Sequence, residues 1–510
     1  MSRETLLATN IISNLLIRIL NMALALVAVR MLVDNVGNDN YGIYVLGTTL
    51  LGYFSLFGLG LPGALLKFIP DRKAKNDYEG LSEIISSSYA FYFGVGLIIS
   101  ISLAIISLFG IHLFRIKPES FDTGRRVLLM VGLWAIVSWP MQIYGQVLMG
   151  LQKFYLLNLA GGTQSILCNG LYVVISLLHL PIEFAVLALS LSQTILYIIT
   201  KHMVKKELPD VSISFHNFKM HTLKYLVGFS FWVLIMQMAG ILIYQTNQLI
   251  IGFFLSMGAI TIYSIQAMPL MGIREINGIA LSASTPAVAD AHALDDKGFI
   301  KELLFRGTRI NMIFVVGLIT VIIAMSHQII YVWMGKNHAR YYYLCQILLS
   351  SYALSVMFSL VGNIIFGMGD VKILGVFSIS TAVIILILSI ILVKPLGLFG
   401  LVMGNLIAQI LVIPAIATIQ FKKINVSFMR FFKEVAVKVY FCAIIFGLIL
   451  WKASSMLGDK PKLIPTIFFA GAGIIFVTGG MFIFACPGED RKKIIQLIIR
   501  GSKNIINFAS

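Results

Sequence analysis

Charged residues are scarce in this sequence. Only 12% of its 510 residues are Asp, Glu, Lys or Arg, about half the share found in an ordinary soluble domain. Hydrophobic residues make up 58% of the chain, and the mean hydropathy is +0.92. So few charges cannot cover a soluble protein of this length with polar groups. The composition therefore excludes a soluble enzyme and indicates a polytopic membrane protein.

Cysteine and the common catalytic motifs are also rare or absent. The four cysteines are widely spaced and all fall inside apolar stretches, which excludes a disulfide framework and the usual zinc spacings. No Walker loop, HExxH or GxSxG motif occurs, so ATP hydrolysis and the common hydrolase chemistries have no support. We therefore expect a protein that is not an enzyme and that has no cofactor, apart from H⁺ or Na⁺ as a coupling ion.

Long apolar windows dominate what is present. About fourteen of them can cross roughly 30 Å of hydrocarbon, which predicts an all-α polytopic membrane protein with about fourteen transmembrane helices. The first window exceeds the apolar core of a signal peptide and should remain as the first span. The windows cover residues 8–34, 41–67, 82–114, 126–150, 153–179, 182–204, 224–255, 259–288, 305–334, 341–367, 372–393, 397–420, 435–452 and 463–486.

The formal charge of +17 lies mostly in loops between the spans rather than on one solvated face. Because basic loops remain in the cytoplasm, this pattern predicts cytoplasmic N- and C-termini in a bacterial-type inner (cytoplasmic) membrane and no nucleic-acid partner. One loop disagrees. Residues 113–126, "LFRIKPESFDTGRR", should lie outside, yet they carry four basic side chains and only two acidic ones.

An internal repeat accounts for the order of the polar residues. Tyr44 and Tyr263 are 219 residues apart, and the same offset relates Asp77 to Asp296 and Glu83 to Glu302; Gly150 and Gly367 are 217 apart, and Gln193 and Gln409 are 216 apart. Six spans per repeat return the chain to the same side, so the two halves should be parallel. We expect an N-lobe at 1–210, a C-lobe at 211–425, two further spans at 426–488 and an amphipathic cytoplasmic tail at 489–510.

Several segments carry a family resemblance. "GNDNYGIYVLGTTLLGYFSLFGLGLPGALLKFI", "VLMGLQKFYLLN" and "QLIIGFFLSMGAITIYSIQAMPL" followed by "STPAVADAHALDD" resemble the polysaccharide transporter family of the MOP flippase superfamily, which also contains the MATE exporters. The resemblance implies two six-helix lobes in a V and a cationic central cavity that opens alternately to the two membrane faces. It also implies transport of a lipid-linked sugar. Many family members have an acidic residue near "YQTNQLIIGFF", where this chain has Asn247 flanked by Gln245 and Gln248.

Two spans carry polar residues at helical spacing. In the first span, Asn10, Asn14, Arg18 and Asn21 lie within one arc of the helix, and in the eighth span Gln266, Arg274, Asn277 and Ser284 follow a similar line. A charge inside a bilayer is costly and is usually functional, so we predict that Arg18, Arg274 and these amides bind substrate, together with Gln245 and Asn247. The alternative for Arg18 is a buried structural arginine bonded by amides and carbonyl oxygens, and the alternative for Arg274 is a local ion pair.

Two other charged residues are weaker candidates. Arg30 could also contact substrate, although Asp34 lies four residues on and favours a surface ion pair. Glu275 is next to Arg274 but points about 100° away from it on a helix. We predict that Glu275 takes up a proton and so couples transport to an ion gradient, since burial raises the pKa of a carboxyl group.

These observations favour a flippase for a polyprenyl-pyrophosphate-linked oligosaccharide, such as an undecaprenyl glycolipid. A guanidinium matches phosphate oxygens in a planar fork and stays charged at physiological pH, while amides can bond sugar hydroxyls. The expected partners are this glycolipid, membrane lipids and other proteins of polysaccharide synthesis. Two alternatives remain: a MATE-like ion-coupled exporter of small amphipathic molecules, and a membrane sugar polymerase or ligase. Against the last, the outer loops are too short to look catalytic.

Overall fold

The computed structural model describes residues 3–58, 61–229, 231–282, 284–458 and 460–492, without the side chains of 3–19, 227–229, 231–233, 279, 280 and 282. These ranges form helices and short connections and contain no β-strand, as the composition predicted. The predicted tail at 489–510 lies mostly outside them, since residues 493–510 are not described.

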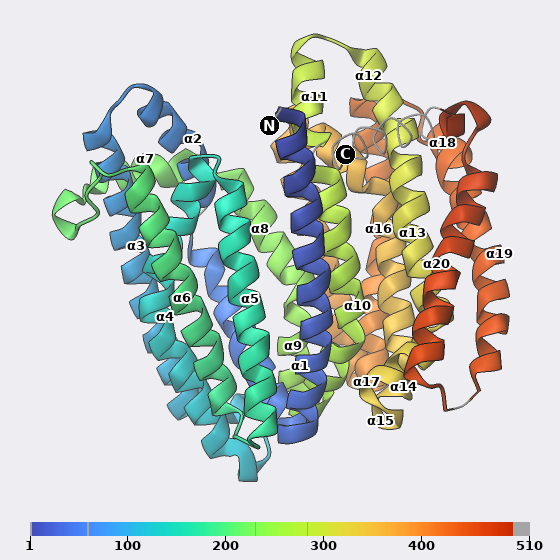
Figure 1. Ribbon diagram of the computed structural model, residues 1–510, viewed down its shortest axis with the longest axis horizontal. Helices are drawn as coiled ribbons and strands as arrows, with labels where there is room; N and C mark the ends of the chain where they lie inside the picture. Colours follow the sequence, from blue (N-terminus) through green and yellow to red (C-terminus); the bar gives the residue numbers. More distant parts are fainter. Residues whose placement is uncertain (1–2, 59–60, 230, 283, 459, 493–510) are drawn as a thin grey trace, which may run out of the picture. The chain divides into compact units, whose positions relative to one another are not determined.

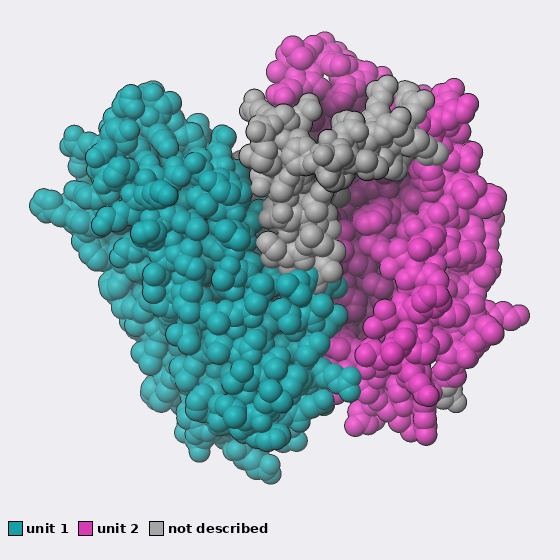
Figure 2. Space-filling view, viewed as in Figure 1, with its two compact units in different colours: residues 1–263 teal, residues 264–510 magenta. Residues whose placement is uncertain are grey.

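The chain divides into two compact units, residues 1–263 and 264–510 (Figures 1 and 2). Figure 1 labels their helices in chain order. The first contains α1 (Arg3–Tyr53), η1 (Phe54–Gly58), α2 (Leu61–Ala74), α3 (Tyr78–Ile105), α4 (Phe121–Gly150), α5 (Phe154–Leu177), α6 (Glu183–Glu207), η5 (Phe215–Asn217), α7 (Met220–Phe229), α8 (Phe231–Tyr244), α9 (Thr246–Phe254) and the start of α10 (Met257–Ser282). The second continues with the rest of α10, α11 (Ser284–Ala293), α12 (Lys297–Glu302), α13 (Thr308–Ala324), α14 (Ser326–Met334), α15 (Lys336–Ala339), α16 (Tyr342–Gly367), α17 (Val371–Lys423), α18 (Phe428–Phe431), α19 (Val437–Ser454) and α20 (Leu463–Ala485).

Within the described ranges, nine helices are long and apolar enough to cross a membrane, or ten if the bent pair α8 and α9 counts as one span. Two of these helices contain a residue with non-helical backbone angles. Gly37 divides α1 with φ 76° and ψ 167°, and Gly397 divides α17 with φ 58° and ψ −138°. Positive φ is costly for residues with a Cβ, so a glycine allows each chain reversal without strain. The predicted number of about fourteen spans remains a prediction.

The same packing contact recurs in the two units at positions related by the repeat. A Cβ placed on Gly150 of α4 would lie 3.0 Å from the Ile69 Cβ of α2, and one placed on Gly367 of α16 would lie 2.9 Å from the Val288 Cβ of α11. Each glycine thus lets two helices approach more closely than any larger residue would. The offsets are 217 for the glycines and 219 for their partners.

Turn geometry follows the same spacing. Six of the ten described residues with positive φ occur in pairs, namely Asn76 and Asp295, Gln152 and Gly369, and His179 and Gly397, at offsets of 219, 217 and 218. Asp77 then accepts a hydrogen bond from the Gly80 N–H at 2.8 Å, and Asp296 accepts one from the Phe299 N–H at 2.9 Å. These bonds cap the N-termini of α3 and α12. The Gly80 N–H and the Arg72 guanidinium lower the pKa of Asp77 below its usual value.

The two helices after the repeat pack closely against α13 in the second unit. A Cβ on Gly317 would lie 2.7 Å from the Thr478 Cγ2 of α20, and one on Gly447 of α19 would lie 2.8 Å from the Thr320 Cγ2. Small residues at such contacts allow the close backbone approach typical of membrane helix pairs. At the N-terminal end of α13, buried Arg309 bonds Asp490 at 2.6 Å, just beyond the end of α20.

Carboxylates offset the positive charge of the loop at residues 113–126. Lys117 lies 2.6 Å from Asp39, Arg126 bonds Glu183 at 2.7 Å, and Arg125 is 3.9 Å from Asp122. Two of these carboxylates come from other parts of the first unit. The loop is therefore less positive in the folded protein than its sequence alone suggests.

Candidate functional site

The seventh apolar window is a broken helix. α8 and α9 meet at an angle of 43° at Gln245, and the three residues that follow, Thr246, Asn247 and Gln248, are all buried. The Tyr53 hydroxyl at the end of α1 hydrogen-bonds the Thr246 hydroxyl. Any side chain at Gly52 would collide with the Gln245 amide. The break therefore places several polar groups in close contact inside a largely apolar unit.

These polar groups retain acceptor capacity. Asn247 donates a hydrogen bond of 2.7 Å to the Tyr263 hydroxyl, but its Oδ1 and the Oε1 atoms of Gln245 and Gln248 are buried without a hydrogen-bond partner. Amide oxygens accept hydrogen bonds from hydroxyl groups. The described residues include no cluster of His, Cys, Asp or Glu that could hold a metal ion. The predicted candidates Gln245 and Asn247 thus lie together at the helix break.

The polar residues of α10 divide into two groups. Gln266 donates to the His338 carbonyl oxygen at 3.0 Å, and Asn277 donates to the Tyr352 hydroxyl at 2.9 Å. Both amides are buried and pack inside the second unit, which leaves only their amide oxygens without a partner. Arg274 is half-buried between them, whereas Glu275 is exposed. The predicted line of polar residues in α10 thus comprises two amides that bond within the second unit, Gln266 and Asn277, and one arginine, Arg274.

The first span is described only in part. The side chains of Asn14 and Arg18 lie outside the described residues. Asn21 is half-buried, and its Oδ1 is buried without a hydrogen-bond partner. Arg30 and Asp34 are both exposed and lie 3.7 Å apart, so the surface ion pair expected from their spacing is present.

Asp39, which no pattern in the sequence singles out, joins three segments of the first unit. One carboxylate oxygen accepts the Gly258 N–H in the first turn of α10 at 3.0 Å, and the other bonds Lys117 at 2.6 Å. Next to it, Thr261 donates to the Asn38 carbonyl oxygen at 2.6 Å. The bond to Asp39 raises the pKa of Lys117 above its usual value, so Lys117 stays charged throughout the neutral range. A carboxylate at a helix N-terminus also interacts favourably with the helix dipole.

We expect Asp39→Ala to loosen the start of α10. Loss of a capping side chain costs about 0.5–2 kcal/mol, so the Gly258 amide should exchange its hydrogen about ten-fold faster. Hydrogen–deuterium exchange of residues 256–262 measures this. Asp34→Ala is the matched control, because its carboxylate pairs on an exposed helix face. Equal exchange in the two variants would show that Asp39 does not hold this turn.

Comparison with known proteins identifies related sequences. The family described as polysaccharide biosynthesis protein matches residues 7–292, more than half of the chain. A Shigella flexneri protein that carries the description of an O-antigen transporter is 20% identical over 385 residues, which cover 74% of this chain and 88% of that protein.

Solved structures show the same fold at low sequence identity. The lipid II flippase MurJ in an inward closed conformation matches with a TM-score of 0.70 and 14% identity over 93% of this chain and 98% of that one. An inward-facing multidrug resistance MATE transporter of the MOP superfamily matches with a TM-score of 0.64 and 17% identity, over 81% of this chain and 98% of that one. A MOP superfamily transporter from Pyrococcus furiosus matches with a TM-score of 0.58 and 17% identity, over 82% of this chain and 95% of that one. The predicted all-α fold of the MOP type is therefore confirmed.

Proposed function

Because the chain belongs to the family of polysaccharide biosynthesis proteins, we propose that it is a flippase for a polyprenyl-pyrophosphate-linked oligosaccharide. The glycolipid moves from the cytoplasmic to the outer leaflet by alternating access, for export of a cell-surface polysaccharide. The similarity to a Shigella flexneri protein described as an O-antigen transporter supports this assignment. The observation that carries it is half-buried Arg274 in the otherwise mostly apolar helix α10, which the sequence predicts as the eighth span, because an intramembrane charge is by default functional.

The chemistry of the substrate matches these side chains. A pyrophosphate carries negative charge that hydrocarbon excludes, and the planar fork of a guanidinium can bind two of its oxygens at once. We propose that Arg274 and Arg18 bind the pyrophosphate in a cationic cavity. The amides of the first span and of the α8–α9 break, Asn14, Asn21, Gln245 and Asn247, bind sugar hydroxyls. Gln266 and Asn277 of the eighth span can add only the amide oxygens that their packing bonds leave unpaired, and Arg30, which pairs with Asp34 on the surface, is the weakest candidate.

The proposed mechanism assigns the chain to an N-lobe at 1–210, a C-lobe at 211–425 and two further spans at 426–488. The basic loops support an inner-membrane protein with cytoplasmic termini. Its partners are an undecaprenyl-type glycolipid, membrane lipids and other proteins of polysaccharide synthesis. The related proteins named above are transporters, which supports the prediction that the chain is not an enzyme. The similarity to a multidrug transporter concerns the fold alone. A transport path that contains Arg18 and Arg274 would repel cationic drugs, which argues against the exporter alternative.

Reconstitution tests the proposed function. Purified protein in liposomes should carry a polyprenyl-pyrophosphate oligosaccharide to the outer leaflet, where an added glycosidase cleaves it. A rate equal to that of protein-free liposomes would contradict the proposal, as would transport of an organic cation in its place.

The same assay with and without a proton or sodium gradient tests Glu275. If Glu275→Gln keeps the normal rate and the normal gradient dependence, Glu275 is not the coupling group.

A further inference from the structure

An apolar groove lies in the first unit between α3 and the linker that joins α6 to α7. Its volume is about 380 Å³, and its lining is almost wholly apolar. Phe91, Gly94 and Ile98 of α3 form one wall; Phe215, Phe218 and Leu223 form the other. Gly94 has no neighbouring atom within 4 Å of the position that a Cβ would take. The groove therefore has free space at its centre.

Backbone hydrogen bonds fix the linker to α3. Ser82, Ser86 and Ser87 accept the N–H groups of Ser212, Ser214 and Lys219 at 3.2, 3.1 and 3.0 Å. The Phe215 ring packs edge-on against the rings of Tyr89 and Phe93, at centroid distances of 5.6 and 5.5 Å. Hydrogen bonds and aromatic contacts thus hold the second wall of the groove in place against α3.

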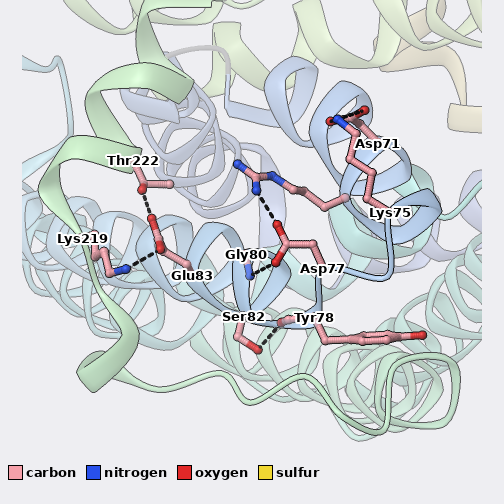
Figure 3. A network of polar contacts seen from close by, with 10 residues as sticks. Asp71, Lys75, Asp77, Tyr78, Gly80, Ser82, Glu83, Lys219 and Thr222 are labelled. Atoms are coloured by element: carbon pink, nitrogen blue, oxygen red, sulfur yellow. Dashed lines mark hydrogen bonds and ion pairs between the residues drawn. The ribbon is translucent and has the colours of Figure 1, made fainter.

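Charged contacts complete the attachment (Figure 3). The Glu83 carboxylate of α3 bonds Lys219 at 2.7 Å and also accepts the Thr222 hydroxyl, while Asp77 caps the same helix through Gly80. The bond to Glu83 raises the pKa of Lys219 above its usual value. The linker and the start of α7 are therefore anchored on α3 beside the groove.

The corresponding helix face in the second unit is covered by protein. With the repeat offset of 219, Ile98 and Ile101 of α3 correspond to Gly317 and Thr320 of α13. Gly317 lies against α20 and Thr320 against α19, whereas Ile98 and Ile101 are 51% and 59% exposed. Among the described residues of the first unit, no helix takes the place of α19 or α20 on this part of α3. In a membrane, hydrocarbon chains of lipid cover such a face.

Basic residues adjoin the lining of the groove in the sequence. Lys219, His221 and Lys224 are all exposed and flank Phe218 and Leu223. Lys219 is bonded to Glu83, so the positive charge of this rim comes mainly from Lys224. A basic linker of this kind is retained on the cytoplasmic side, where anionic lipids attract each nearby Lys or Arg by about 1 kcal/mol. Apolar walls and a cationic rim together match a lipid with an anionic headgroup.

We propose that the groove binds one hydrocarbon chain of an anionic phospholipid of the cytoplasmic leaflet. The chain lies along α3 over Gly94, and the headgroup lies near Lys224 and His221. The volume is at the lower end of the range for ligand sites, about 300–1,000 Å³, which suits a single chain. None of the groove residues is a proposed substrate-binding residue, so the site rests on the proposed orientation in the membrane but not on the proposed substrate.

Photolabelling in vesicles tests the site. Vesicles of phosphatidylethanolamine would contain a trace of phosphatidylglycerol with a diazirine in one acyl chain, or of phosphatidylcholine with the same chain. Phosphatidylglycerol should label residues 90–98 and 215–223 about five-fold more than phosphatidylcholine does. Gly94→Leu should reduce this labelling to background. Lys224→Gln should lower the phosphatidylglycerol signal towards that of phosphatidylcholine.

Gly170→Leu is the matched control, since Gly170 is an exposed helical glycine of α5 whose Cβ position is equally open. It should label like the wild type. Ala90→Leu fills the groove one turn away and replaces Gly94→Leu if that variant fails to fold. Wild-type labelling in both filled variants would overturn the site. Equal labelling by the two lipids would overturn the assignment of an anionic headgroup.

Discussion

Arg274→Ala is expected to abolish glycolipid transport, whereas Arg274→Lys should retain part of it. Removing one partner of a desolvated, hydrogen-bonded charge pair costs at least about 2–5 kcal/mol, so the affinity for a pyrophosphate-linked glycolipid should fall about a hundred-fold. Lysine keeps the charge but loses the bidentate fork. The measurement is binding of the glycolipid to purified variants at matched amounts of folded protein, together with the rate of transport in liposomes.

Arg18→Ala should behave in the same way if both guanidinium groups bind one pyrophosphate. Arg126→Ala is the matched control, because Arg126 is an exposed arginine near the start of α4 that already pairs with Glu183 of α6. Undiminished glycolipid affinity in both Arg18→Ala and Arg274→Ala would refute the pyrophosphate contact. If instead the loss of transport follows the loss of folded protein in the membrane, the arginines are structural.

Arg309→Met is expected to destabilise the second unit strongly. Arg309 is only 7% exposed; its Nη1 bonds Asp490 at 2.6 Å, and its Nη2 donates to the Glu434 carbonyl oxygen at 3.4 Å. Loss of one partner of a fully buried ion pair costs about 3–5 kcal/mol. Asp490 is 21% exposed and lies 3.7 Å from Arg306, so the loss here should reach only the lower end of this range. Urea titration in detergent, followed by the accessibility of buried Cys486, measures the effect.

The double variant Arg309→Met, Asp490→Leu separates the ion pair from packing. Replacing both charges by apolar groups is often neutral, so the double variant should recover most of the lost stability. Arg430→Met is the control, since its partner Glu434 forms an exposed i,i+4 pair with it, and such pairs contribute only about 0.3–0.5 kcal/mol. Additive losses in the double variant would contradict a specific Arg309–Asp490 interaction.

The sequence predicted the fold well because membrane helices are specified by long apolar windows. It also located the polar segments at 245–248 and 266–277. It could not predict which partner each polar residue would meet. Gln266 and Asn277 lie on the predicted helical line, but they bond His338 and Tyr352 within the second unit. Helical periodicity shows that residues share a face, whereas the element that covers this face depends on tertiary packing.

Asp39 also shows that the sequence does not predict tertiary partners, here for a residue that no pattern singled out. In the sequence it is one of several polar residues in "VDNVGNDNYG", which looks like a solvated connection. Its partners are Lys117 and Gly258, and the latter is 219 residues away. Pairing over such distances leaves no local pattern. The helix break at Gln245 was missed for a similar reason, since no proline or glycine marks it and Tyr53 and Gly52 come from a distant helix.

The ion pairs of the loop at residues 113–126 bear on the biogenesis of the protein. Lys117 pairs with Asp39, which emerges from the ribosome earlier, whereas Arg126 pairs with Glu183, which is synthesised later. On the proposed orientation this loop crosses the membrane against the rule that retains basic loops in the cytoplasm. Asp39 is already available when Lys117 is translocated, but Arg126 reaches the membrane ahead of Glu183. The insertion machinery therefore meets the full charge of Arg126 and a charge on Lys117 that can already be offset.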